Sequence, residues 1–292
     1  MVDATGTGAR GVEEEIAADA SRRDGAAEAA SALRIGVVHY LNSWPLAWTF
    51  LRGGAPAGVE PVYLPPAEVA EGLASGELAA GLLPSAELQR IPDLAVVPGL
   101  CIASQHEVRS VLLVSRVPFG EIRRLALDAS SRTSAVLVQL LLAERFGVRP
   151  TAVPFRPDLD AMLASADAAL LIGDPALHVD RDGYEVIDLA AEWRALTGLP
   201  FVFAVWAVRG DAAWTELPAV LAASLAASER ELPQLVAEAA ASSGLPVPVV
   251  DTYFRRHLSY RLGKAELASL DEFFRRAHHH GLLPEPQPLR LL

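Results

Sequence analysis

Short apolar runs alternate with helical segments along residues 34–89, and this alternation constrains the fold more than any other feature of the sequence. Unbroken runs of β-branched and aliphatic residues are typical of strands buried on both faces of a sheet, whereas apolar residues at a spacing of about three to four indicate helices. Alternation of the two predicts an α/β fold in which strands pair in parallel. The predicted strands are 34–38, 59–64 and 78–83, and the predicted helices are 44–51, 66–73 and 85–89.

A second unit with the same alternation follows in the middle of the chain. It has predicted strands at 123–127 and 167–172, and the segment 133–146 between them is apolar on nearly all sides, which is typical of a buried helix. The β-type run 201–208 would return the chain to the first unit. The remainder is mostly helical in pattern, over 214–241, 249–257 and 264–280.

These units predict a two-lobed α/β protein whose second lobe is inserted into the first. Both lobes are expected to have mostly parallel sheets flanked by helices, with a ligand cleft between them. Residues 1–33 are rich in alanine, glycine and acidic residues, and they predict a disordered leader. The predicted boundaries are 34–115 with 205–292 for the first lobe and 116–204 for the second.

Charge and composition argue against several functional classes. The chain carries 36 acidic and 25 basic residues, a net charge of −11, which argues against nucleic acid or an anionic membrane as a partner. The leader lacks the basic and apolar regions of a secretory signal, and no apolar run is long enough to span a membrane, so we expect a cytoplasmic protein. The single lysine, Lys264, lies in a polar helical segment, which argues against Schiff-base chemistry.

Cysteine and histidine usage predicts no metal site. The single cysteine, Cys101, excludes an internal disulfide and a cysteine-built metal site, and we expect it to be a small buried hydrophobe, while a nucleophilic role stays open. The neighbours His278, His279 and His280 would splay around a helix instead of sharing one face.

Polar residues follow two of the predicted strands. The segment 130–134 precedes the apolar helix, whose free N–H groups and dipole favour an anion, and Arg132 can bind a carboxylate through two nitrogens. The alternative is a plain helix cap with Arg132 facing solvent. After the first strand, Asn42 suits the orientation of a substrate hydroxyl or carboxylate, and Tyr40 offers a phenol. The alternatives are an asparagine that stabilises its own turn and a tyrosine that belongs to the core.

Six segments in unbroken order carry a resemblance to a known family. They are Tyr40-Leu41-Asn42 with Pro45-Leu46, and the segments 98–104, 108–115, 131–134, 168–174 and 197–204. Together, over about residues 34–280, they resemble the chorismate dehydratase family, which acts first in the futalosine route to menaquinone. This resemblance implies the fold of type II periplasmic binding proteins, which agrees with the two lobes expected from the strand pattern.

The resemblance implies a lyase that removes water from chorismate to give 3-[(1-carboxyvinyl)oxy]benzoate. The reaction takes the ring proton at C3 and the hydroxyl at C4, and a stepwise elimination through a delocalised dienolate is expected. Because the product is aromatic, the reaction is strongly downhill and needs neither a redox cofactor nor a metal. The protein would position the substrate and stabilise charge on its ring carboxylate.

The resemblance also implies roles for individual residues. Thr133 and Ser134 would bind one carboxylate with help from Arg132, and Asn42 would orient the C4 hydroxyl or the enolpyruvyl group. The general base would be Asp174 or the substrate's own enolpyruvyl carboxylate, and Asp174 could equally cap the helix that begins at Pro175. The other expected substrate-binding residues are Tyr40, Ser85, Ser104, Ser110 and Gly173, with the three serines facing the second carboxylate.

Two other functions stay open from the sequence. One is 1,4-dihydroxy-6-naphthoate synthase of the same pathway, which shares the fold but acts on a larger substrate. The other is a non-catalytic protein that binds a small anion, since a fold alone does not specify a function. The sequence also leaves a homodimer open.

Overall fold

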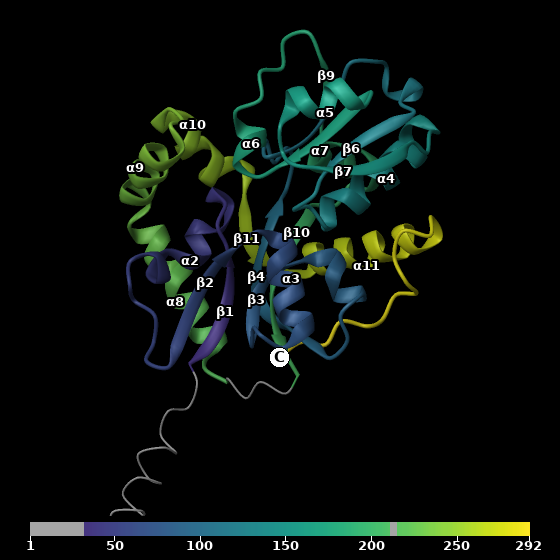
Figure 1. Ribbon diagram of the computed structural model, residues 1–292. Coiled ribbons are helices and arrows are strands. Elements are labelled where there is room, and N and C mark those ends of the chain that lie inside the picture. The colour runs from purple at the N-terminus through teal and green to yellow at the C-terminus, as the bar shows by residue number, and fades with distance from the viewer. Residues whose placement is uncertain (1–31, 211–214) are drawn as a thin grey trace, which may run out of the picture.

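The computed structural model describes residues 32–210 and 215–292. Most of the predicted leader, up to residue 31, lies outside the described residues, as does Trp214 at the start of the predicted helical region. The described chain forms two lobes, each built on one sheet with helices packed against it (Figure 1). No helix within the described ranges combines the length and apolar character that a membrane span requires.

The first lobe contains β1 (Leu33–Val38), η1 (Leu41–Ser43), α2 (Trp44–Leu51), β2 (Val59–Leu64), α3 (Pro66–Ser75), β3 (Ala80–Pro84), η2 (Ser85–Gln89) and β4 (Leu94–Ser104). After the second lobe it continues with β10 (Phe201–Arg209), α8 (Leu217–Arg230), α9 (Leu232–Ser243), α10 (Val247–Thr252), the π-helical turn η4 (Tyr253–His257), β11 (Ser259–Leu262) and α11 (Lys264–His279). Its six-stranded sheet has the order β11-β4-β10-β3-β1-β2.

The second lobe contains β5 (Val111–Ser115), η3 (Phe119–Glu121), β6 (Arg124–Asp128), α4 (Thr133–Phe146), β7 (Thr151–Phe155), α5 (Leu159–Ser165), β8 (Ala168–Ile172), α6 (Asp174–Leu177), β9 (Glu185–Asp188) and α7 (Leu189–Thr197). Its five-stranded sheet has the order β7-β6-β8-β5-β9.

The predicted elements of the first unit agree closely with the observed ones. The helix α2 and the strand β2 have the predicted bounds, and Pro45 suits the first turn of α2. The helix α4 of the second lobe also has its predicted bounds, whereas α3 continues to Ser75, two residues beyond the prediction. Gly76 after α3 and Gly147 after α4 have φ angles of 83° and 70°, the left-handed conformation that closes a helix.

Strand pairing differs from the prediction in two respects. β5 pairs with β8 and β9, so the second lobe begins no later than Val111 and not at residue 116. β10 pairs with β4 from Phe201 onward, so residues 201–204 belong to the first sheet. The described strand pairs are four parallel and five antiparallel, since β10 and β5 both run against their two neighbours and β11 runs against β4. The sheets are therefore mixed, and not mostly parallel.

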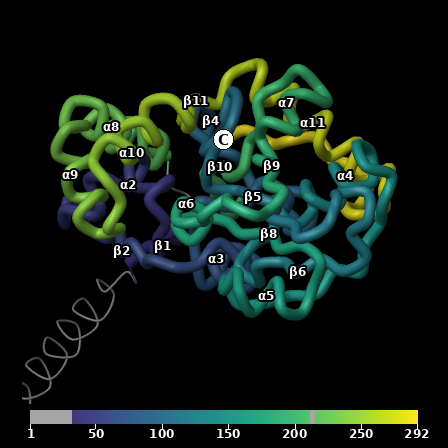
Figure 2. Tube along the Cα trace, turned by 90° about the horizontal axis from the view of Figure 1, so that it is seen from above, coloured from purple at the N-terminus to yellow at the C-terminus, as the bar shows by residue number. Residues whose placement is uncertain are grey.

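The two lobes share a packing region formed by α4, α7 and α11. Figure 2 shows α4, α7 and α11 gathered at one end of the molecule, and α11 of the first lobe contacts α4 of the second. Trp193 of α7 packs edge-on against Phe273 of α11, with ring centroids 6.0 Å apart, and both side chains are fully buried. This shared core fixes how the strand ends of the lobes face each other.

Candidate functional site

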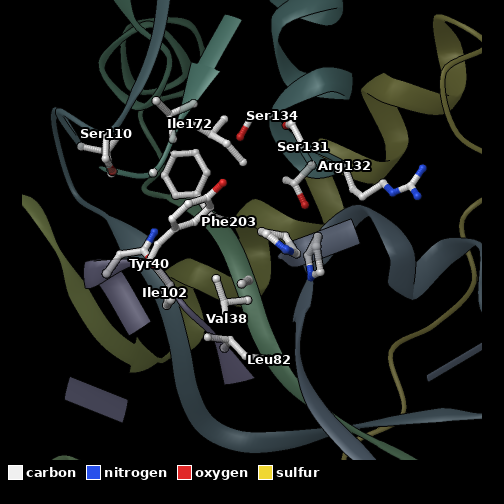
Figure 3. Close-up of a pocket in the computed structure, with 18 residues that line it drawn as sticks. Val38, Tyr40, Leu82, Ile102, Ser110, Ser131, Arg132, Ser134, Ile172 and Phe203 are labelled. Carbon is white, nitrogen blue, oxygen red and sulfur yellow. The ribbon is translucent and has the colours of Figure 1, made fainter. Parts of the chain in front are cut away.

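A cavity lies between the lobes, where strands of both sheets end. Its empty volume is about 540 Å³, which includes the part open to solvent. Figure 3 shows side chains from both lobes around it. The polar lining residues are Tyr40, Asn42, Ser110, Ser131, Arg132, Thr133 and Ser134. The other lining residues are Val38, Pro66, Leu82, Pro84, Ile102, Val108, Val111, Ile172, Gly173, Phe203 and Ala204.

Seven of the ten predicted site residues line this cavity. They are Tyr40, Asn42, Ser110, Arg132, Thr133, Ser134 and Gly173, while Ser85, Ser104 and Asp174 do not line it. Asn42 and Thr133, which are 91 positions apart in the chain, thus belong to one cavity. The sequence analysis missed the apolar walls, since an apolar residue at the end of a strand gives no signal that separates it from the core.

The N-terminus of α4 lies at the cavity, where its first residues form part of the lining. No side chain caps this helix, and its first turn holds no acidic residue. Thr133 Oγ1 accepts a hydrogen bond from the amide of Ala86 at 3.1 Å and lies 3.4 Å from Ser85 Oγ. Because Ser85 gives its own proton to Val202, the Thr133 proton points to Ser85 unless a ligand oxygen in the cavity accepts it instead. Ser134 follows at 5% exposure and lines the same wall. Free amides, two hydroxyls and the helix dipole together favour a carboxylate here.

Arg132 lines the cavity, and its guanidinium also contacts a residue of the other lobe. Its Nη2 donates to Glu71 of α3 at 2.7 Å, and Figure 3 shows the guanidinium directed away from the other lining residues. Its Nε is buried and has no partner among the described residues. One outer nitrogen of the guanidinium therefore pairs with Glu71, and binding of a substrate carboxylate through two nitrogens of Arg132 stays a prediction.

The turn after β1 presents Asn42 to the cavity. Ser43 holds this turn, since its hydroxyl donates to the carbonyl oxygens of Val38 and of Tyr40. Asn42 Oδ1 is buried and has no hydrogen-bond partner among the described residues. A buried amide oxygen without a partner costs free energy unless a ligand or water satisfies it. This favours a ligand-binding Asn42 over one that stabilises its own turn.

Two of the predicted serines are engaged by the protein itself. Ser85 is fully buried behind Thr133, where it donates to the carbonyl oxygen of Val202 at 2.8 Å. Ser104 donates to the carbonyl oxygen of Glu107 at 3.0 Å. Neither hydroxyl reaches the cavity wall, so only Ser110 of the three predicted serines can meet a ligand directly.

Asp174 of the second lobe forms a hydrogen bond to the first lobe next to the cavity. Its Oδ1 accepts a hydrogen bond from the amide of Leu41 at 3.0 Å, so it orders the turn that carries Asn42. It does not cap α6, which begins at Asp174 itself. Burial raises the pKa of this carboxyl, while the Leu41 amide and the charges of His39 and His178 oppose the shift.

A buried tyrosine that was not predicted from the sequence donates a hydrogen bond to Ser110. Tyr253 is 2% exposed, and its hydroxyl donates to Ser110 Oγ at 2.7 Å. Burial raises the pKa of this phenol above its ordinary value, so it remains a donor. Ser110 therefore keeps its own proton for a ligand in the cavity.

Cys101 lies in β4, outside the cavity lining, and is fully buried. Burial, and secondarily the charge of Glu266, raises the pKa of its thiol. We expect the native protein to resist a thiol reagent such as 5,5′-dithiobis(2-nitrobenzoate), because the thiolate is the reactive form. Absorbance should report one thiol per chain only after denaturation. Fast labelling of the native protein at neutral pH would contradict this expectation.

Residues 32–210 and 215–292 hold no group of three or more histidine, cysteine, aspartate or glutamate residues arranged to bind a metal ion. Of the three neighbouring histidines at the end of α11, for which the sequence predicted no shared face, His280 contacts charged side chains of the other lobe. His280 is paired with Glu144 at 3.1 Å and with Arg149 at 2.8 Å.

Comparison with known proteins gives a consistent result. A family model described as menaquinone biosynthesis matches residues 33–279. The chorismate dehydratase of Thermus thermophilus is 32% identical over 260 residues, covering 82% of this chain and 93% of that protein.

Solved structures share the fold at lower identity. A protein from Archaeoglobus fulgidus has a TM-score of 0.71 at 16% identity and covers 86% of this chain and 98% of its own. The alkanesulfonate-binding protein SsuA from Xanthomonas axonopodis, bound to MOPS, has a TM-score of 0.65 at 19% identity, covering 87% of this chain and 94% of its own. SsuA of Escherichia coli has a TM-score of 0.61 at 18% identity, covering 90% and 94%. The two-lobed fold of periplasmic binding proteins is thus confirmed.

Proposed function

This chain belongs to the menaquinone-biosynthesis family, and from that premise we propose that it removes water from chorismate in the cavity between its lobes. The single observation that carries the proposal is the pairing of an uncapped helix N-terminus with neutral hydroxyl and amide groups in one mostly apolar cavity. Chorismate combines two carboxylates with a hydrocarbon ring, and the cavity offers a complementary surface for each part.

The charge of the lining suits a dianion. Of the residues described around the cavity, none is aspartate or glutamate, so the substrate meets no fixed negative charge at van der Waals distance. We place the ring carboxylate at Thr133 and Ser134, where the helix dipole stabilises the negative charge that grows as the C3 proton leaves. Ser110, which also lines the cavity, is then proposed to bind the second carboxylate.

The same lining supports a proposal for the general base. The described lining residues include no aspartate, glutamate, histidine, lysine or cysteine. Asp174 lies outside the lining and is hydrogen-bonded to the Leu41 amide. We therefore propose that the substrate's enolpyruvyl carboxylate removes the C3 proton and that Asp174 positions the turn that carries Asn42.

The remaining steps need positioning and stabilisation by this chain. Removal of the C3 proton gives a dienolate delocalised into the ring carboxylate, and loss of the C4 hydroxide then gives the aromatic product 3-[(1-carboxyvinyl)oxy]benzoate. Asn42 is proposed to orient the C4 hydroxyl or the enolpyruvyl group through its unpartnered Oδ1 and its amide protons. The apolar walls hold the ring and exclude water.

The test is to incubate the purified protein with chorismate alone and to follow the ultraviolet absorption of an aromatic product. Consumption of chorismate with formation of one aromatic acid would support the proposal. Binding without turnover would favour a small-anion binding protein. No interaction with chorismate, together with turnover of a cyclised futalosine derivative, would favour 1,4-dihydroxy-6-naphthoate synthase.

Ser134→Ala should raise KM for chorismate about tenfold, which corresponds to about 1.4 kcal/mol for a hydrogen bond to a charged group. We expect the stability of the protein to stay nearly unchanged, because Ser134 is not needed to cap α4. Steady-state kinetics and thermal unfolding measure the two effects. Ser165→Ala, at an exposed serine of the same lobe, is the matched control. A KM equal to that of the control would contradict the placement of the carboxylate.

A further inference from the structure

A chain of hydroxyl groups connects the cavity to a buried carboxyl group. The hydroxyl of Tyr40, a lining residue, lies 3.1 Å from Ser130 Oγ. Ser130 in turn donates to Asp128 Oδ1 through its hydroxyl at 2.7 Å and through its amide at 2.9 Å. Tyr40 comes from the first lobe and the other two residues from the second, so the chain of hydrogen bonds crosses between lobes.

Asp128 is placed to carry a proton. It is 1% exposed at the end of β6, and its Oδ2 is buried with no hydrogen-bond partner among the described residues. Burial raises the pKa of this carboxyl, although hydrogen bonds from Ser130 and the backbone of Ile172 oppose the shift. A carboxyl group in such surroundings takes up a proton more readily than an exposed one.

The protonation state of Asp128 sets the direction of the hydrogen bonds. When Asp128 is ionised, Ser130 donates to it and accepts from Tyr40, so the phenol presents only lone pairs to the cavity. When Asp128 is protonated, its carboxyl proton is donated to Ser130 Oγ, and the Ser130 hydroxyl donates to the Tyr40 oxygen. The Tyr40 proton is then free to point into the cavity. The cavity thus contains a donor that is present only while the buried carboxyl holds a proton.

We propose that Asp128, Ser130 and Tyr40 form a proton relay that delivers a proton to the hydroxide leaving C4. The proposal rests on the dehydratase function proposed above. The C4–O bond breaks with its electron pair on oxygen, and the Tyr40 proton passes to this oxygen to form water. The Ser130 proton then moves to Tyr40, and the Asp128 proton moves to Ser130. Asp128 remains as a carboxylate and regains a proton from solvent, while the C3 proton goes to the enolpyruvyl carboxylate.

Other lining hydroxyls have different connections. Ser110 is joined to Tyr253, and Thr133 lies 3.4 Å from Ser85 and accepts from Ala86. Among the described residues, neither of these chains of hydrogen bonds leads to a carboxyl group. Tyr40 is therefore the lining residue whose hydroxyl is connected by hydrogen bonds to a carboxyl group that can supply a proton. Hydroxide is a poor leaving group, so a donor at this point lowers the barrier of the second step.

The charges around the relay determine its response to pH. Burial raises the pKa of the Tyr40 phenol most, and the negative charges of Asp128 and Asp174 nearby raise it further. Asp174 is faced in turn by His39 and His178. Because the relay acts with Asp128 protonated, kcat should fall as pH rises through the pKa of Asp128 in the complex. Asp128→Asn should remove that alkaline decline.

The kinetic test compares Asp128→Asn, Ser130→Ala and Tyr40→Phe with the wild-type protein. Each variant should lower kcat about 100-fold, at the lower end of what general acid catalysis contributes, with KM changed by less than about threefold. The double variant of Asp128 and Ser130 should be no slower than the slower single variant, because either change breaks the relay. Ser130→Thr keeps a hydroxyl and should restore most of the activity. Tyr63→Phe, at a tyrosine 40% exposed, is the control.

A spectroscopic test does not depend on turnover. The infrared spectrum of the wild-type protein should contain a carboxylic-acid C=O band that titrates with pH, is absent in Asp128→Asn and is displaced in Ser130→Ala. If chorismate is not a substrate, the dehydratase proposal fails, and this band alone decides whether the coupled carboxyl exists. Absence of the band, or relay variants with unchanged kcat and pH dependence, would overturn the relay.

Discussion

Asn42→Ala is expected to lower kcat for chorismate dehydration by about 100-fold or more, which corresponds to roughly 2.7 kcal/mol in the barrier. Asn42 lines the cavity, and its buried Oδ1 has no partner among the described residues, so this oxygen is available to the substrate. Removing a preorganised polar group beside the breaking bonds leaves the charge of the transition state less stabilised. Chorismate consumption under saturating conditions measures the effect.

The control for this prediction uses the fact that Asn42 is the only asparagine of the chain. Protein labelled with nitrogen-15 in asparagine should give one pair of side-chain amide resonances, which should shift when the aromatic product is added. Thermal unfolding should show that Asn42→Ala is folded, because Ser43 holds the turn. Turnover within about threefold of the wild-type rate, less than ~0.7 kcal/mol, would contradict the proposed role.

Gly173→Ala is expected to reduce both stability and turnover. A Cβ atom at this position would lie 2.7 Å from ring carbons of Tyr40, and the backbone has φ 65° and ψ −147°, a conformation that is nearly confined to glycine. We expect the free energy of unfolding to fall by about 2–3 kcal/mol and kcat by about 100-fold, because the Tyr40 ring must leave its place against Gly173. Denaturant unfolding and chorismate kinetics measure the two effects.

Gly147→Ala is the matched control for this substitution. Gly147 also has a positive φ angle of 70°, but a Cβ atom there would meet nothing within 4 Å. It should therefore destabilise the protein only by the cost of placing alanine in the left-handed conformation, about 1 kcal/mol, and leave kcat unchanged. In a Tyr40→Ala background, Gly173→Ala should cost less stability than in the wild type. Equal costs in the two backgrounds would show that the ring contact is not the cause.

The site could be predicted from the sequence only in part. The rule that ligands bind beyond strand ends located the 40–44 and 130–134 segments, and the structure brings both to one cavity. It could not separate Ser110, which faces the cavity, from Ser104, which donates to a nearby carbonyl oxygen. Which way a loop hydroxyl points depends on partners that the local sequence does not contain. The homodimer and the cytoplasmic location remain predictions.

The sequence by itself determined the local elements, because helix and strand periodicity and glycine stops act over a few neighbouring residues. The bounds of α2 and α4 followed from such signals. The tertiary structure alone decided that β5 joins the second sheet and that Tyr40 meets Ser130, 90 positions away. Contacts of that kind depend on how two separately folded sheets face each other, and this arrangement is set by packing between α4, α7 and α11.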